Sequence, residues 1–171
     1  SIWAFRIMEM ADSLTNNDFI NSTQLISGAS GGMIGAAYYR ELYLQKRLGI
    51  HQKVSNTKSI TNVGKDLLNP IAFSITVSDL FFNIQKFKEG ETKFNKDRAY
   101  AFEQQLNENT GYVLSKPLSS YKEAEASGLI PMMIFSPTIV NDGRRLLISP
   151  QHVSYLTDHA ADSSFNFETT I

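Results

Sequence analysis

The sequence of 171 residues predicts an α/β fold with a sheet of mixed strand direction, in a single domain that spans residues 1–171. Segments with apolar residues at helical spacing alternate with short apolar segments typical of strands, which is the pattern of α/β proteins. A hairpin sequence around residue 142 adds antiparallel strands. The hydrophobic content of 42% is enough for one core, and no repeat or linker divides the chain.

The first third of the chain predicts a helix, a strand and a second helix. The helix over 2–14 has its apolar residues at helical spacing, namely Ala4, Ile7, Met8, Ala11 and Leu14. A polar turn over 15–18 ends it. Thr23–Ile26 is a strand candidate that leads directly into a glycine-rich segment. A long helix follows as far as Leu48, and Gly49 suits a left-handed stop.

The middle of the chain predicts two further helices joined by loops. Residues 50–69 are polar without a clear period, so we expect a loop with one helical turn. The next helix has one apolar face, formed by Phe73, Val77, Leu80, Phe81, Ile84 and Phe87. We interpret it as an ordinary core helix, although such a face could also line an acyl-chain pocket or rest on lipid. After a lysine-rich loop, Asn95 is placed to cap a helix that Gly111 ends, with apolar positions Ala99, Phe102 and Leu106.

The last third predicts a short helix and a hairpin. Ser120 and Glu123 have the spacing of a capping box, and Gly128 would end the helix that they begin. Residues 131–140 predict a strand, Asn141-Asp142-Gly143 a tight turn, and 144–148 the returning strand. The tail from Pro150 to Ile171 is polar and poorly patterned.

Composition excludes several classes of function. Sixteen basic and seventeen acidic residues give a net charge of −1 without a basic stripe, so we expect no nucleic-acid partner. The chain has no cysteine, which excludes thiolate catalysis and is typical of a reducing compartment; we expect the cytoplasm or a membrane surface. The longest apolar stretch, 71–84, is shorter than the roughly 20 residues of a membrane span. No histidine or carboxylate pair has metal-ligand spacing, so the sequence predicts no metal and no cofactor.

The segment Gly28-Ala29-Ser30-Gly31-Gly32 matches G-x-S-x-G, the pattern of a nucleophile elbow. Such an elbow is a sharp turn between a strand and a helix, with the serine hydroxyl standing clear of the sheet. Gly28 and Gly32 let neighbouring backbone approach closely. The amide of Gly31 and the start of the helix point at the place where an oxyanion develops. The pattern therefore predicts Ser30 as a nucleophile and Gly31 as an oxyanion donor.

Other functions of a glycine-rich turn fit less well. A phosphate-binding loop requires a lysine followed by Ser or Thr directly after the glycines, and Met33-Ile34 stand there instead. A dinucleotide fingerprint, G-x-G-x-x-G, does not match the spacing of Gly28, Gly31 and Gly32. A turn whose glycines serve packing alone is the structural alternative.

The run L-I-S-G-A-S-G-G-M-I-G-A-A, residues 25–37, resembles the elbow of patatin-like phospholipases. In that family a strand, G-x-S-x-G and a helix rich in Gly and Ala follow one another. The segment 130–149 resembles the family's hairpin, and the helix 2–14 resembles the one after the family's glycine-rich loop. The resemblance spans most of residues 2–149 in order, and it is specific at residue level at the elbow.

The resemblance implies a three-layer sheet with helices on both faces and a Ser–Asp dyad that hydrolyses lipid or phospholipid esters. Ser30 would attack the acyl carbonyl and Gly31 would stabilise the oxyanion. The dyad aspartate and the glycine-rich oxyanion loop would lie outside this chain. We therefore expect the central portion of a patatin-like catalytic domain, incomplete at both ends and inactive alone. Its partners would be a lipid or acyl-ester substrate, a membrane surface in peripheral contact, and further copies of itself.

Two alternatives to this dyad enzyme stay open. Asp142 stands in Asn-Asp-Gly between two apolar strands, which is typical of a hairpin turn. Ser30, Asp142 and either His152 or His159 nevertheless reproduce the chain order of an α/β-hydrolase triad, so a Ser–Asp–His esterase is the alternative enzyme. These histidines and His51 lie in polar segments, where we expect solvated side chains. A non-catalytic structural or interaction module that retains the elbow is the third hypothesis.

Overall fold

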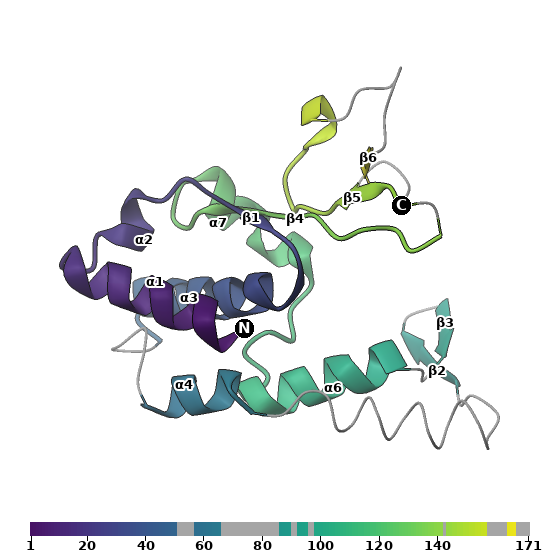
Figure 1. Ribbon diagram of the computed structural model, residues 1–171, viewed down its shortest axis with the longest axis horizontal. Coiled ribbons are helices and arrows are strands. Elements are labelled where there is room, and N and C mark those ends of the chain that lie inside the picture. The colour runs from purple at the N-terminus through teal and green to yellow at the C-terminus, as the bar shows by residue number, and fades with distance from the viewer. Residues whose placement is uncertain are drawn as a thin grey trace.

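The computed structural model describes residues 1–50, 57–65, 86–89, 92–95, 98–141, 143–156 and 164–166 (Figure 1). Helices and small sheets are combined in it, as the α/β class requires. The described strands form three two-stranded sheets rather than the continuous sheet of mixed direction that the sequence predicts. Two of the sheets are parallel and one is antiparallel.

The N-terminal helix α1 spans Ile2–Leu14, which confirms the predicted range. A turn with two left-handed residues, Asn16 and Asn17, leads into the short helix α2, Phe19–Ser22. The buried Asp12 fixes this corner. Its Oδ1 accepts a hydrogen bond from the Ile20 amide at 3.2 Å, and its Oδ2 accepts one from the Tyr39 hydroxyl at 2.9 Å.

The predicted strand and long helix are both present. Strand β1 spans Leu25–Gly28, two residues later than predicted, because the Thr23 amide still donates to the Ile20 carbonyl of α2 at 3.3 Å. Helix α3 spans Ser30–Arg47 and carries much of the buried surface of the described chain. Gly49 follows it at φ +74°, which confirms the left-handed stop.

The middle of the chain departs from prediction. Helix α4 spans Thr57–Val63, inside the predicted loop with a helical turn. Most of the predicted helix with the Phe73–Phe87 face lies outside the described residues. Its last residue belongs instead to strand β2, Lys86–Glu89, which pairs in antiparallel fashion with β3, Thr92–Asn95. The lysine-rich loop and the Asn95 cap were therefore wrong predictions.

Helix α6, Arg98–Thr110, ends at Gly111 with φ +67°, as the glycine predicts. After a turn, the 3₁₀ helix η2, Leu118–Tyr121, leads directly into helix α7, Lys122–Ala126. The predicted capping box is wrong because the Ser120 hydroxyl donates to the Pro117 carbonyl at 2.7 Å inside η2. Gly128 ends the helical segment in a left-handed conformation, as predicted.

The C-terminal hairpin is shorter and looser than its sequence pattern. Strand β4 covers Met132–Phe135 and strand β5 covers Arg145–Leu147. The chain returns through two isolated antiparallel bridges, Phe135 to Ile148 and Thr138 to Arg145, around Gly143 at φ +76°. The ladder breaks at Pro137 because proline has no amide hydrogen to donate.

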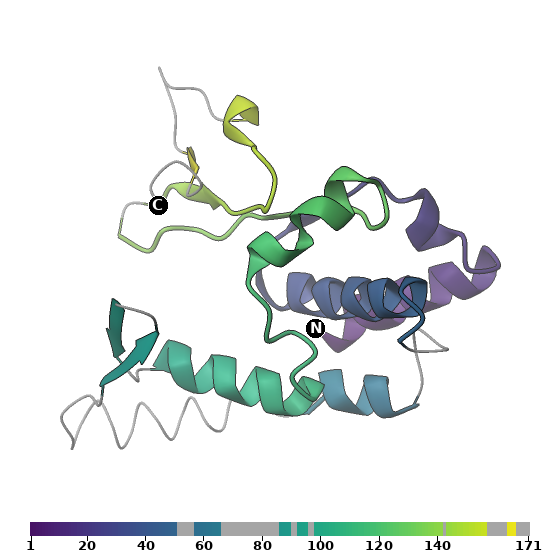
Figure 2. The same ribbon diagram turned by 180° about the vertical axis from the view of Figure 1, so that it is seen from behind.

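The tail contains more structure than its composition predicts. The 3₁₀ helix η3 spans Ser154–Leu156, and strand β6, Ser164–Asn166, pairs in parallel with β5. Seen from behind, α4 and α6 lie on one side of the α1–α3 pair, while β5 and η3 lie on the other (Figure 2). Among the residues that the structure describes, none of the helices combines the length and apolar character needed to cross a bilayer.

The core lies between α1, α3 and the strand pair β1–β4. Strands β1 and β4 run parallel, with Leu25 opposite Met132 and Gly28 opposite Phe135. The ring of Phe5 packs between α1 and α3 against Tyr38 and Tyr39, with ring centroids 5.5 Å and 5.3 Å apart. The main cluster of buried apolar side chains includes Phe5, Met8, Ile20, Met33, Ala36, Tyr38, Tyr39, Leu42, Tyr43, Leu44, Tyr121, Ile130 and Met133.

Candidate functional site

Ser30 stands at a strained turn between β1 and α3. Ala29 is extended, with φ −139° and ψ 172°, and Ser30 then takes a left-handed φ of +59°. A residue with a Cβ rarely adopts this conformation, which costs about 1–3 kcal/mol when it is enforced. The strand and the helix meet here without a loop, so the chain reverses sharply at this one residue. This is the backbone geometry that a nucleophile elbow needs.

The side chain of Ser30 is exposed to solvent. Its hydroxyl has no hydrogen-bond partner among the described residues, whereas the buried Tyr39 hydroxyl of the same helix donates to Asp12. The hydroxyl therefore plays no evident part in holding the turn together. It is free to meet a molecule that arrives from solvent.

Strand β4 holds the approach to the turn in place. The Ser136 amide donates to the Gly28 carbonyl at 2.8 Å, and the Met132 amide donates to the Gln24 carbonyl at 2.9 Å. These two bonds frame β1 at both of its ends. The last residue before the turn, Ala29, therefore leaves a strand whose position is fixed.

The first backbone amides of α3 lie beside Ser30. Neither a capping side chain nor an acidic residue in the first turn satisfies them. The first amides of a helix have no partner within the helix, and the helix dipole adds partial positive charge at the same end. Gly31 follows the serine directly, so its amide is one of these donors. An oxygen that gains negative charge next to Ser30 would be stabilised here.

The glycines around Ser30 differ in how tightly they are packed. A Cβ at Gly28 would meet the Met33 sulfur at 3.2 Å, which is a contact with a flexible side chain. A Cβ at Gly32 would meet nothing within 4 Å, so the predicted close approach of backbone is wrong there. The close approach occurs instead at Gly35, where a Cβ would lie 2.0 Å from the Ser1 carbonyl oxygen.

The start of α1 lies against the start of α3. A Cβ at Gly31 would lie 3.3 Å from the Ser1 backbone nitrogen, and the Cβ at Gly35 would meet the carbonyl group of the same residue. Gly31 and Gly35 are four residues apart and share one helix face. Sequence reasoning missed Gly35, although the G-x-x-x-G spacing from Gly31 was a signal for close backbone packing. The backbone that enters α1 is thereby placed beside the Ser30 turn.

A buried ion pair joins α3 to strand β4, the partner of β1. The Arg40 guanidinium forms an ion pair with Glu125, and it also donates to the Pro131 carbonyl at 2.9 Å. Glu125 Oε1 accepts the Met133 amide of β4 at 3.2 Å. Burial raises the pKa of the Glu125 carboxyl above its ordinary value, and this outweighs the lowering effect of Arg40. One carboxylate thus joins α3, α7 and β4, the partner strand of β1.

A second buried carboxylate, Glu41, extends this network. Its Oε1 accepts hydrogen bonds from the Gln45 amide at 2.7 Å and the Lys116 ammonium at 2.5 Å. The Arg40 guanidinium lies 4.7 Å from the ring centroid of Tyr121. Burial, followed by the charge of Glu41, raises the pKa of the Tyr121 hydroxyl. Sequence reasoning missed this network, because no local spacing relates α3 to residues far along the chain.

Of the residues of the alternative triad, the structure describes Ser30 and His152. Asp142, His51 and His159 lie outside the described residues. His152 is exposed, and its Nδ1 lies 2.9 Å from the Ser154 hydroxyl of the next turn. Within the described part of the chain, no cluster of three or more His, Asp or Glu side chains could hold a metal ion.

Comparison of the chain with protein-family models, with curated proteins and with solved structures gave no match.

Proposed function

We propose that this chain carries the nucleophile elbow of a serine acyl-hydrolase of the patatin-like type, acting on carboxylic esters of lipids. One observation carries the proposal. Ser30 of a G-x-S-x-G motif has a left-handed φ of +59° between a strand and a helix, with an exposed hydroxyl and no described bonding partner. In a turn that served packing alone, glycine at this position would be unstrained and serine would be strained. The presence of serine therefore favours a role for its hydroxyl.

In the proposed reaction, the Ser30 oxygen attacks the acyl carbonyl carbon and its proton passes to a carboxylate base. The carbonyl oxygen becomes an oxyanion, which the Gly31 amide and the N-terminal end of α3 stabilise. Collapse of this intermediate breaks the ester bond, and the base passes its proton to the departing alkoxide, so that the alcohol leaves and an acyl group stays on Ser30. A water molecule then gives a proton to the same base and attacks the acyl carbonyl, which releases the acid and restores the Ser30 hydroxyl.

We propose an aspartate outside these residues as the base, as the resemblance to patatin-like phospholipases implies. The position of α1 suits the same interpretation, because the backbone at Ser1 lies beside Gly31. A glycine-rich loop that preceded α1 would therefore enter next to the serine, where a second oxyanion donor is useful. A three-layer sheet, with further strands beside the β1–β4 pair, belongs to this proposal.

Labelling with a fluorophosphonate tests the nucleophile, because this reagent adds covalently to an activated serine. In the longer polypeptide that the proposal requires, we expect label on the peptide containing Ser30 and hydrolysis of p-nitrophenyl butyrate. Ser30→Ala should lose both, with turnover lower by several powers of ten. Ser27→Ala is the matched control, since Ser27 is an exposed serine on the adjacent strand. Retention of a third of the activity in Ser30→Ala would exclude Ser30 as the nucleophile.

The same assay separates the dyad from the triad. If the base is an aspartate outside these residues, Asp142→Asn, His152→Ala and His159→Ala should each keep activity within a few-fold. The isolated 171-residue chain should show no useful turnover, since a missing base and a missing oxyanion donor each cost powers of ten. Loss of several powers of ten in both Asp142→Asn and one histidine variant would establish the Ser–Asp–His alternative.

A further inference from the structure

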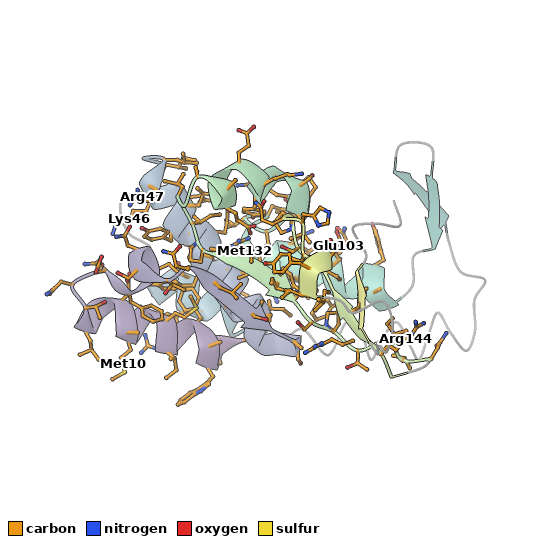
Figure 3. All side chains as sticks on the ribbon, turned by 90° about the horizontal axis from the view of Figure 1, so that it is seen from above. Met10, Lys46, Arg47, Glu103, Met132 and Arg144 are labelled. Carbon is orange, nitrogen blue, oxygen red and sulfur yellow. The ribbon has the colours of Figure 1, made fainter. Side chains whose placement is uncertain are left out.

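Helix α1 has apolar side chains on two opposite faces. One face is covered, because Phe5 and Met8 are buried against the body of the protein. The other face carries Trp3, Ile7, Met10 and Leu14, which are 76%, 45%, 60% and 74% exposed. Their spacing of four, three and four residues is that of a helix–helix seam. Met10 points away from the rest of the molecule in Figure 3.

The exposed face is a continuous apolar stripe, and none of its four residues is charged. The charges at its margin, Arg6 and Glu9, form an ion pair with each other at 2.5 Å. Two such faces can therefore meet without bringing like charges together. The small residues Ala4 and Ala11 flank the stripe and would allow the backbones of two helices to come close. A helix that is apolar on both sides is typical of a buried position.

The area of the stripe approaches the requirement of a dimer. Its four side chains present about 420 Å² of apolar surface, taking roughly 200 Å² for the tryptophan and roughly 150 Å² for each aliphatic side chain. A standard interface buries about 800 Å² on each partner. In a homodimer about 65% of that area is apolar, which is about 500 Å², so the stripe supplies most of it.

We propose that the apolar stripe of α1 is the interface of a two-fold dimer with a second copy of this chain. The same patch then serves both subunits, as a two-fold axis requires. Because the start of α1 lies against Gly31, the interface begins close to the Ser30 turn. The proposal does not depend on the chemistry of Ser30, since it uses no residue of the elbow.

The experiment measures mass and tryptophan emission together on the 171-residue chain. Trp3 is the chain's one tryptophan, so its fluorescence reports on the stripe alone. We expect the mass from sedimentation to change from monomer to dimer with concentration, and the emission to shift to shorter wavelength over the same range. Met10→Glu should raise the dissociation constant at least about tenfold, because it buries an unpaired charge.

The control is Val140→Glu, which adds the same charge at a residue that is 95% exposed in the hairpin. It should dimerise like the parent chain. Circular dichroism should show that both variants keep their helices. Met10→Lys serves as a second variant should Met10→Glu fail to fold, and it should weaken the dimer equally. A monomer at all concentrations would overturn the proposal. So would a dimer that Met10→Glu leaves intact, or a Trp3 shift seen with phosphatidylcholine vesicles alone.

Discussion

At the scale of single residues, Ser30 combines strain with exposure. The other left-handed positions that the sequence predicts are glycines, namely Gly49, Gly111, Gly128 and Gly143, because glycine takes positive φ without a Cβ clash. These four were predictable because each glycine follows the last residue of a helical or strand pattern. Ser30 was predictable through its motif, whereas the left-handed Tyr112 was not, because no local pattern places an aromatic residue at positive φ.

The strain at Ser30 predicts a difference between two substitutions that both remove the hydroxyl. Ser30→Gly should be more stable than Ser30→Ala by about 1 kcal/mol, because alanine keeps the Cβ that opposes φ +59°. Chemical denaturation of the two variants measures this difference. Both should be equally inactive in the longer polypeptide. Equal stability, or a more stable alanine variant, would show that the turn is not strained in solution.

At the scale of elements, the helix that the apolar period predicts over 2–14 matches α1 residue by residue. The β2–β3 hairpin was missed because its lysines suggested a loop. The alternation in Lys86-Phe87-Lys88 was nevertheless a strand signal, and Phe87 lies opposite Phe94 in the hairpin. The predicted capping box failed because η2 precedes α7 without a break, so the segment begins before Ser120.

The contact between α1 and α3 predicts a strong effect at Gly35. In Gly35→Ala the new Cβ would lie 2.0 Å from the Ser1 carbonyl oxygen and 3.2 Å from the Phe5 amide. Both are backbone atoms, so the start of α1 must move. We expect a loss of about 1–3 kcal/mol in the free energy of unfolding, the range for overpacking.

Gly32→Ala is the matched control for Gly35→Ala. It lies one turn earlier on the same helix, and its new Cβ would meet nothing within 4 Å. The higher helix propensity of alanine should leave its stability unchanged or raised by up to about 1 kcal/mol. Urea denaturation followed by circular dichroism gives both values. Equal effects of the two substitutions would mean that α1 does not pack at Gly35.

At the scale of the whole molecule, the sequence predicted the presence of strands but not their arrangement. Strand β1 pairs with β4, which is separated from it by most of the chain, and a parallel pair leaves no local turn signal. The buried Arg40–Glu125 pair is equally non-local, joining the same β4 to α3. The motif around Ser30 could thus be identified from the sequence, whereas the strand pair and the ion pair that surround it could not.

The buried Glu125 predicts how stability depends on pH. Its pKa in the folded chain is raised by burial, so the folded state holds the proton more tightly than the unfolded state does. Its contribution to stability is therefore fully present below the ordinary glutamate pKa of 4.5, and it is lost as the pH rises through the raised value. Glu125→Gln keeps the side-chain shape and removes this titration.

The informative measurement is the unfolding free energy of Glu125→Gln minus that of the parent chain, taken from pH 4 to pH 8 by denaturant titration. Subtraction cancels the other titrating groups, and Arg40 stays charged at every pH used. We expect the difference to rise with pH and then level off. The parent chain loses stability as Glu125 loses its proton, whereas the variant has no proton to lose at this position. A difference that falls with pH would mean that Arg40 lowers the pKa of Glu125 more than burial raises it.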